Sequence, residues 1–128
     1  MAQRYLLVDD NLGFLEAARD LLEGEGVDVV GVASTSGETL RLVAQLQPDV
    51  VLVDVDLGEE SGFDLASRLA IVTADTRVVL ISAYPEAEFA DLIAASGAIG
   101  FVSKAELSAQ AVSNLLEDGG DVGRGRAN

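Results

Sequence analysis

The sequence predicts an α/β fold in which one parallel sheet is covered by helices on both faces. Five short apolar segments alternate with five longer segments in which apolar residues recur at helical spacing. Short connections join them, and segment 49–54 is almost continuously apolar, as in a strand buried on both faces. Right-handed crossovers between successive strands then give a single parallel sheet between two helical layers.

The first strand, the first helix and the second strand follow from the N-terminal third of the chain. Residues 4–9 read RYLLVD, a short apolar run that ends in an acid. Apolar residues at helical spacing continue through 11–26, where Gly24 and Gly26 mark the end of the helix. The valine-rich segment 27–34 is typical of a strand.

The second helix and the third strand are separated by a proline. Segment 36–47 has one apolar face, and we expect Ser36 to cap its N-terminus. Pro48 ends this helix before the strand at 49–54. Residues 57–62, LGEESG, predict a loop without regular structure.

The third helix is predicted at residues 63–72 and the fourth strand at 77–82, which reads RVVLIS. Pro85 is well placed to open a fourth helix over 85–96, because its fixed φ suits the first helical turn. Gly97 then ends that helix.

The fifth strand and helix are predicted at residues 98–103 and 105–117. The remaining segment 118–128 carries four glycines and no apolar stripe. We therefore expect one domain at 1–117, followed by a flexible tail or the start of a linker at 118–128. Either a stand-alone domain or a fragment of a longer protein fits this organisation.

Composition restricts the function. The chain has 128 residues, of which 49% are hydrophobic, and a net charge of -14, which argues against binding of nucleic acid phosphates by this chain. The N-terminus lacks the pattern of a secretory signal, and no apolar run has the length of a membrane span. Cysteine is absent, so we expect a cytoplasmic protein without disulfides.

Polar residues stand where the predicted strands end. Asp9 and Asp10 follow the first strand, Asp54 ends the third, Ser82 ends the fourth, and the fifth runs into Lys104. Ligands of doubly wound sheets bind at this edge. Clustered carboxylates favour a hard cation such as Mg²⁺, and a carboxylate also attacks phosphorus to form an acyl phosphate.

Lys104 is the only lysine in a chain that otherwise uses arginine for its basic residues. A compact ammonium on a flexible stem suits a single phosphate oxygen better than the broad guanidinium fork. With the carboxylates and the Ser82 hydroxyl, it would supply the neutralising groups that phosphoryl transfer needs.

The sequence resembles the receiver domain of bacterial two-component response regulators. The matching pieces occur in family order over residues 4 to about 117: LLVDDN, PDVVLVDVDLGEESGFDLA, VVLISA and SGAIGFVSK. The resemblance implies a flavodoxin-like (βα)5 sandwich with strand order 2-1-3-4-5. It also implies a response regulator that accepts a phosphoryl group from a sensor histidine kinase or a phosphotransfer protein.

The resemblance assigns a role to each site residue. Asp54 is the implied phosphoacceptor. Mg²⁺ or Mn²⁺ would be bound by Asp54, directly by Asp10, mainly through water by Asp9, and by the backbone carbonyl of Asp56. The other implied residues are the switch hydroxyl Ser82, the invariant-type Lys104, the rotating aromatic Phe101, and Asp56 and Tyr84 as residues that tune phosphoryl turnover.

Three positions depart from the family pattern. Gly58 replaces the usual proline after the acceptor strand, so we expect a more mobile loop there. Ala105 replaces a proline that often forms a cis bond with the lysine, which leaves the path of Lys104 open. Phe101 has no hydroxyl, so a switch at this ring would work through burial alone.

The implied output is a phosphorylation-dependent change of the face formed by segments 85–96, 98–103 and 105–117, which would bind a partner, an output domain or a second copy. Two alternatives stay open. A degenerate receiver would act as a protein-interaction module without phosphorylation. The DVDLG segment at 54–58 also resembles the DxD signature of haloacid-dehalogenase-like phosphatases, but the acidic pair here precedes the lysine. We therefore expect a phosphoacceptor rather than a multi-turnover enzyme.

Overall fold

The protein folds around one five-stranded parallel sheet, as the alternating pattern predicted. The computed structural model describes residues 2–125, with side chains described through residue 118. The sheet order is β2-β1-β3-β6-β7, which is the predicted order 2-1-3-4-5 of the main strands. These strands are β1 (Arg4–Val8), β2 (Asp28–Ala33), β3 (Val50–Asp54), β6 (Arg77–Ser82) and β7 (Gly100–Ser103).

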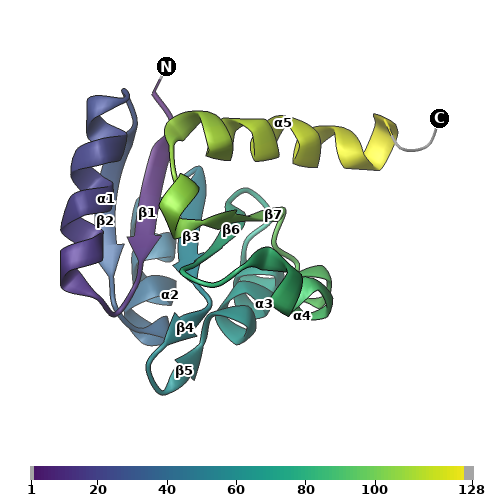
Figure 1. The fold of residues 1–128 in the computed structure, drawn as a ribbon, viewed down its shortest axis with the longest axis horizontal. Helices are drawn as coiled ribbons and strands as arrows, with labels where there is room; N and C mark the ends of the chain where they lie inside the picture. Colours follow the sequence, from purple (N-terminus) through teal and green to yellow (C-terminus); the bar gives the residue numbers. More distant parts are fainter. Residues whose placement is uncertain (1, 126–128) are drawn as a thin grey trace.

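Helices cover both faces of the sheet (Figure 1). Side chains that alternate along each strand enter two separate apolar cores. Tyr5 and Leu7 point to the core shared with α1 and α5, whereas Leu6 and Val8 point to the core shared with α2 and α3. The helices are α1 (Leu12–Gly24), α2 (Ser36–Leu46), α3 (Gly62–Val72), α4 (Ala90–Ala95) and α5 (Ala109–Gly125).

Side-chain caps satisfy the N-termini of three helices, α1, α2 and α3, near the carboxyl ends of the strands. Asn11 Oδ1 accepts a hydrogen bond from the backbone N–H of Phe14 at the start of α1. Ser61 caps α3 in the same manner. The cap predicted at Ser36 was wrong: Thr35 accepts from the N–H of Glu38, and Ser36 is already helical. Thr35 has the extended backbone of an N-cap, which explains why it takes this position.

The fourth and fifth helices begin later than predicted. Residues 85–96 form a 3₁₀ turn, Glu86–Phe89, followed by the short α4. Another 3₁₀ turn, Lys104–Glu106, precedes α5, which starts only after Ser108. The Ser108 hydroxyl accepts a hydrogen bond from the N–H of Ala111, so it caps α5 and fixes its start.

The segment 118–128 was predicted as a flexible tail or the start of a linker because of its glycine content. Helix α5 continues into this segment as far as Gly125. Glycine lowers helix stability without removing the backbone hydrogen bonds of a helix. The rest of the predicted tail, residues 126–128, lies outside the described residues.

The segment predicted as an irregular loop after β3 contains a small antiparallel hairpin, β4 (Asp56–Leu57) and β5 (Glu60–Ser61). Gly58 has φ 74°, a conformation that proline cannot adopt, which accounts for glycine at this position. In Figure 1 the hairpin lies at the end of the molecule toward which β1, β2 and β3 point. The hairpin therefore borders the edge of the sheet that carries the polar residues.

Candidate functional site

Three aspartates meet at the carboxyl end of the sheet, as predicted. Asp9 follows β1 and is fully buried, Asp54 is the last residue of β3 and is 6% exposed, and Asp10 is exposed to solvent. One carboxylate oxygen from each lies within 4.8 Å of the others. The adjacent parallel strands β1 and β3 bring these residues together although more than forty positions separate them in the sequence.

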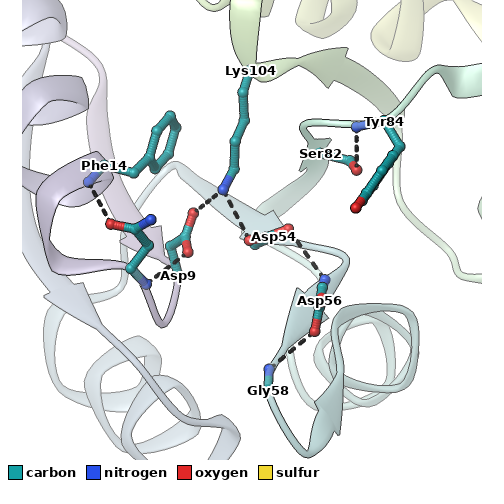
Figure 2. A network of polar contacts seen from close by, with 9 residues as sticks. Asp9, Phe14, Asp54, Asp56, Gly58, Ser82, Tyr84 and Lys104 are labelled. Carbon is teal, nitrogen blue, oxygen red and sulfur yellow. Dashed lines mark hydrogen bonds and ion pairs between the residues drawn. The ribbon is translucent and has the colours of Figure 1, made fainter.

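Lys104 reaches two of these carboxylates from the end of β7. Its Nζ lies 2.6 Å from Oδ2 of Asp9 and 3.0 Å from Oδ2 of Asp54 (Figure 2). The single lysine of the chain is therefore part of the predicted site. Its bond to Ala105 is trans, because the described residues contain no cis peptide bond.

Burial raises the pKa of Asp54 from 3.8 to about 6, and the nearby charge of Asp9 acts in the same direction. The backbone N–H of Asp56, 3.1 Å from Asp54 Oδ1, and the ammonium of Lys104 oppose this rise. Burial alone would lower the pKa of Lys104, but its hydrogen bonds and attraction to Asp9 and Asp54 outweigh burial and raise it. The lysine therefore stays protonated beside a carboxylate that is more basic than that of a solvated aspartate.

Backbone donors hold the carboxylates in place. Oδ1 of Asp9 accepts from the N–H of Asn11 at 2.9 Å, and Oδ1 of Asp56 accepts from Gly58 N at 3.1 Å. Gly62, at the start of α3, lies so close to Asp54 that an added Cβ would collide with its carbonyl oxygen. The hairpin thus returns tightly against the end of β3.

Of the predicted switch and turnover residues, Asp56, Ser82 and Tyr84 lie near Asp54, whereas Phe101 lies in the apolar core. Ser82 ends β6, beside β3, and its hydroxyl accepts a hydrogen bond from Tyr84 N at 3.0 Å. Tyr84 is 60% exposed, and Figure 2 shows both residues on the Asp54 side of the ammonium. Phe101, on β7, is 7% exposed, and its ring centroid lies 6.3 Å from that of Phe89. The ring of Phe101 is therefore in the core in this structure.

Comparison with known proteins identifies the family. The model of the response regulator receiver domain matches residues 5–116. The chain belongs to this family. The relatives of this receiver domain include the response regulator GacA of Pseudomonas aeruginosa, 33% identical over 102 residues, which are 79% of this chain and 48% of GacA. The chain spans about half the length of the curated relatives that it matches, or less.

A second relative carries a different named activity. A protein-glutamate methylesterase/protein-glutamine glutaminase of Myxococcus xanthus is 36% identical over 121 residues, which are 93% of this chain and 34% of that protein. Related receiver sequences therefore occur within proteins of different named activity.

Solved structures agree with this assignment. A LuxR-family two-component response regulator from Aurantimonas has a TM-score of 0.81 and 27% identity, covering 94% of this chain and 86% of that one. A response regulator from Burkholderia pseudomallei, solved with a phosphorylated aspartic acid, a calcium ion and citrate, has a TM-score of 0.80 and 25% identity. The latter match covers 98% of this chain and 73% of the other.

The donor set of this receiver domain fits a hard divalent cation. All three clustered side chains offer carboxylate oxygens, the ligands that Mg²⁺ prefers. Oδ2 of Asp9 is buried, and among the described residues its polar partner is the ammonium of Lys104, 2.6 Å away. A buried carboxylate oxygen with spare capacity, next to the exposed Asp10, is what a partly hydrated cation would need.

Two neighbours of the site were not predicted from the sequence. The ring of Phe14 lies beside the side chain of Lys104, with the ammonium 4.3 Å from the ring centroid (Figure 2). Oε1 of Glu60, in the hairpin, accepts from the N–H of Ser36 at 2.9 Å and so ties the hairpin to α2. Both contacts join segments far apart in the sequence, so no local sequence pattern predicts them.

Within the described part of the chain, no helix combines the length and apolar character that crossing a bilayer requires.

Proposed function

We propose that this receiver domain accepts a phosphoryl group on Asp54 from a phosphohistidine of a sensor kinase or phosphotransfer protein. An oxygen of the Asp54 carboxylate attacks phosphorus, the phosphorus–nitrogen bond of the donor breaks, and the imidazole leaves with that electron pair. The observation that supports this most strongly is the contact of the buried Asp54 with Lys104 beside two further carboxylates.

Each residue has a role that follows from its place. Burial makes the Asp54 carboxylate more basic than a solvated one and so a better nucleophile toward phosphorus. Lys104, 3.0 Å from Asp54 Oδ2, supplies positive charge where the phosphoryl oxygens arrive. Asp9, Asp10 and Asp54, with the carbonyl of Asp56, would hold Mg²⁺ or Mn²⁺. A metal bound there would neutralise charge on the transferring group.

Acetyl phosphate with magnesium tests the phosphoacceptor directly. We expect intact-mass spectrometry to show one added phosphoryl group, which EDTA prevents and which peptide mapping places on Asp54. Asp54→Asn should abolish the addition, whereas Asp64→Asn, at an exposed carboxylate on α3, should leave it unchanged. Full labelling of Asp54→Asn would overturn the assignment.

We also propose that phosphorylation changes the face formed by α4, β7 and α5. The Ser82 hydroxyl accepts from Tyr84 N in the present state, and its O–H would donate to a phosphoryl oxygen on Asp54 and draw Ser82 toward it. Movement of Ser82 would leave space for the Phe101 ring. The altered face would then bind a downstream protein, an output domain or a second copy, within the cytoplasm. Amide chemical shifts with and without beryllofluoride test this change, and identical shifts at β7 would refute it.

A phosphorylation-independent interaction module is the alternative to this proposal. The two differ in whether partner binding depends on Asp54, which the Asp54→Asn variant decides in a pull-down with and without acetyl phosphate. Turnover of a generic phosphomonoester separates both from a phosphatase. We expect none, because we propose a phosphoacceptor and not a multi-turnover enzyme.

A further inference from the structure

The lysine of the site contacts an aromatic ring as well as two carboxylates. Lys104 Nζ lies 4.3 Å from the centroid of the Phe14 ring, within the range of a cation–π interaction. The side chain of Lys104 is only 18% exposed, so water screens this contact weakly. The ammonium is therefore held by groups from three elements: the end of β1, the end of β3, and α1.

A hydrogen-bonded chain fixes the ring relative to one of the carboxylates. The N–H of Asn11 donates to Asp9 Oδ1 at 2.9 Å, and Asn11 Oδ1 accepts from the N–H of Phe14 at 3.0 Å. The cap that starts α1 thus links the backbone of Phe14 to the carboxylate that pairs with Lys104. The ring also packs against the apolar core under α1 and α5, which restricts its motion.

The geometry points to Phe14 as a positioning residue that keeps the Lys104 ammonium directed at the oxygens of Asp54. Lysine has a long flexible stem, and contact with two carboxylates alone would leave it free to swing between them. The ring face attracts the ammonium without a fixed hydrogen-bond direction. It therefore allows the short shift from a carboxylate oxygen to a phosphoryl oxygen while it keeps the charge in the site.

A purely structural role for Phe14 predicts different results from this positioning role. A core residue contributes through buried area, which leucine largely preserves, whereas the attraction of a cation depends on the electrons of the ring. The consequences of the two roles separate in variants that keep the shape of the ring and change its charge distribution.

The single lysine gives an unambiguous reporter. With ¹³C-labelled lysine, only Lys104 contributes side-chain signals. In metal-free protein at neutral pH, we expect its ε-methylene protons to be shifted upfield by the ring. Phe14→Leu should return them toward the value of unstructured lysine. Phe63→Leu, which removes a ring that packs on Phe89 against the core on the other face of the sheet, should leave them in place.

Phosphorylation by phosphoramidate measures the consequence for the reaction. This part of the inference rests on the proposed function. We expect Phe14→Leu to slow phosphorylation about fivefold, which is the effect expected from the loss of one partly buried cation–π contact. Phe14→Tyr and Phe14→Trp should keep the phosphorylation rate of wild-type protein, and so should Phe63→Leu. In contrast, 3,4,5-trifluorophenylalanine at position 14 should slow phosphorylation without loss of thermal stability.

The two proposals fail in distinguishable ways. If wild-type protein takes no phosphoryl group but shows the shifted lysine signal, the proposed function is wrong and the contact stands. If phosphorylation proceeds normally while Phe14→Leu and the trifluorinated ring change neither the lysine signal nor the rate, Phe14 is an ordinary core residue and the positioning role is refuted.

Discussion

Neutralising Asp54 should stabilise the metal-free protein. The rise of the Asp54 pKa from 3.8 to about 6 means that ionising this carboxyl costs about 3 kcal/mol more in the folded protein than in the unfolded chain. That value already includes the favourable contact with Lys104, which keeps its 2.6 Å ion pair with Asp9 when Asp54 is neutral. Asp54→Asn should therefore raise the free energy of unfolding by up to about 3 kcal/mol at pH 7.

The sign of the pH dependence follows from the raised pKa. A carboxyl that is harder to ionise in the folded state lowers stability only when it is ionised. The advantage of Asp54→Asn should thus be small below the unfolded-state pKa of 3.8, grow as pH rises toward 6, and level off above it. Carboxylates distant from the site have the same surroundings in both proteins, so the difference between the two reports on Asp54 and the groups coupled to it.

Urea unfolding in EDTA between pH 4 and pH 8, followed by circular dichroism, measures this difference. Millimolar magnesium supplies the second half of the test, because a ligand at a hundredfold excess over Kd adds about 2.7 kcal/mol. We expect magnesium to stabilise wild-type protein more than Asp54→Asn. A metal-free Asp54→Asn that is less stable than wild type, or an advantage that shrinks as pH rises, would refute a shared carboxylate site.

The remaining predictions concern Lys104 and Gly62. Lys104→Arg should keep the stabilisation by magnesium within about 0.5 kcal/mol of that of wild type. It should lose the amide chemical-shift changes that beryllofluoride induces at β7, because the wider guanidinium approaches one phosphoryl oxygen differently. Chemical-shift changes like those of wild type would contradict this. Gly62→Ala should destabilise the protein by about 1–3 kcal/mol in urea unfolding, since its Cβ would meet the Asp54 carbonyl. The control Gly37→Ala, at an exposed helical position with open space around it, should stabilise by about 0.5–1 kcal/mol; equal effects of the two changes would disprove the close approach.

The sheet and the position of the site were predictable because they depend on local patterns. Alternating apolar segments set the strand positions, and the carboxyl ends of parallel strands meet at one edge. Asp9, Asp54 and Lys104 therefore had to converge. Their roles in phosphoryl transfer stay predictions, since the geometry alone reports contacts and not chemistry.

Contacts between distant segments could not be read from the sequence. Nothing near Phe14 indicates that Lys104 reaches it, because the contact depends on the rotation of α1 and on the path of the 3₁₀ turn after β7. The Glu60–Ser36 hydrogen bond likewise depends on how the hairpin folds back. The starts of two helices were also misplaced. At α2 the adjacent hydroxyls of Ser34, Thr35 and Ser36 offer competing caps, whereas at α5 the 3₁₀ turn Lys104–Glu106 delays the helix until after Ser108.

The ion pairs of Lys104 also limit which electrophiles its amine can react with. Only a neutral amine attacks an acyl carbon, and the raised pKa of Lys104 keeps this amine protonated at neutral pH. Acetyl phosphate presents both an acyl carbon and a phosphorus atom to the same pocket. Under the proposed function, the carboxylates that hold the ammonium would suppress acetylation of the one lysine side chain and leave the anionic Asp54 to take the phosphoryl group. We therefore expect acetyl phosphate to add a phosphoryl group at the site and no acetyl group at Lys104.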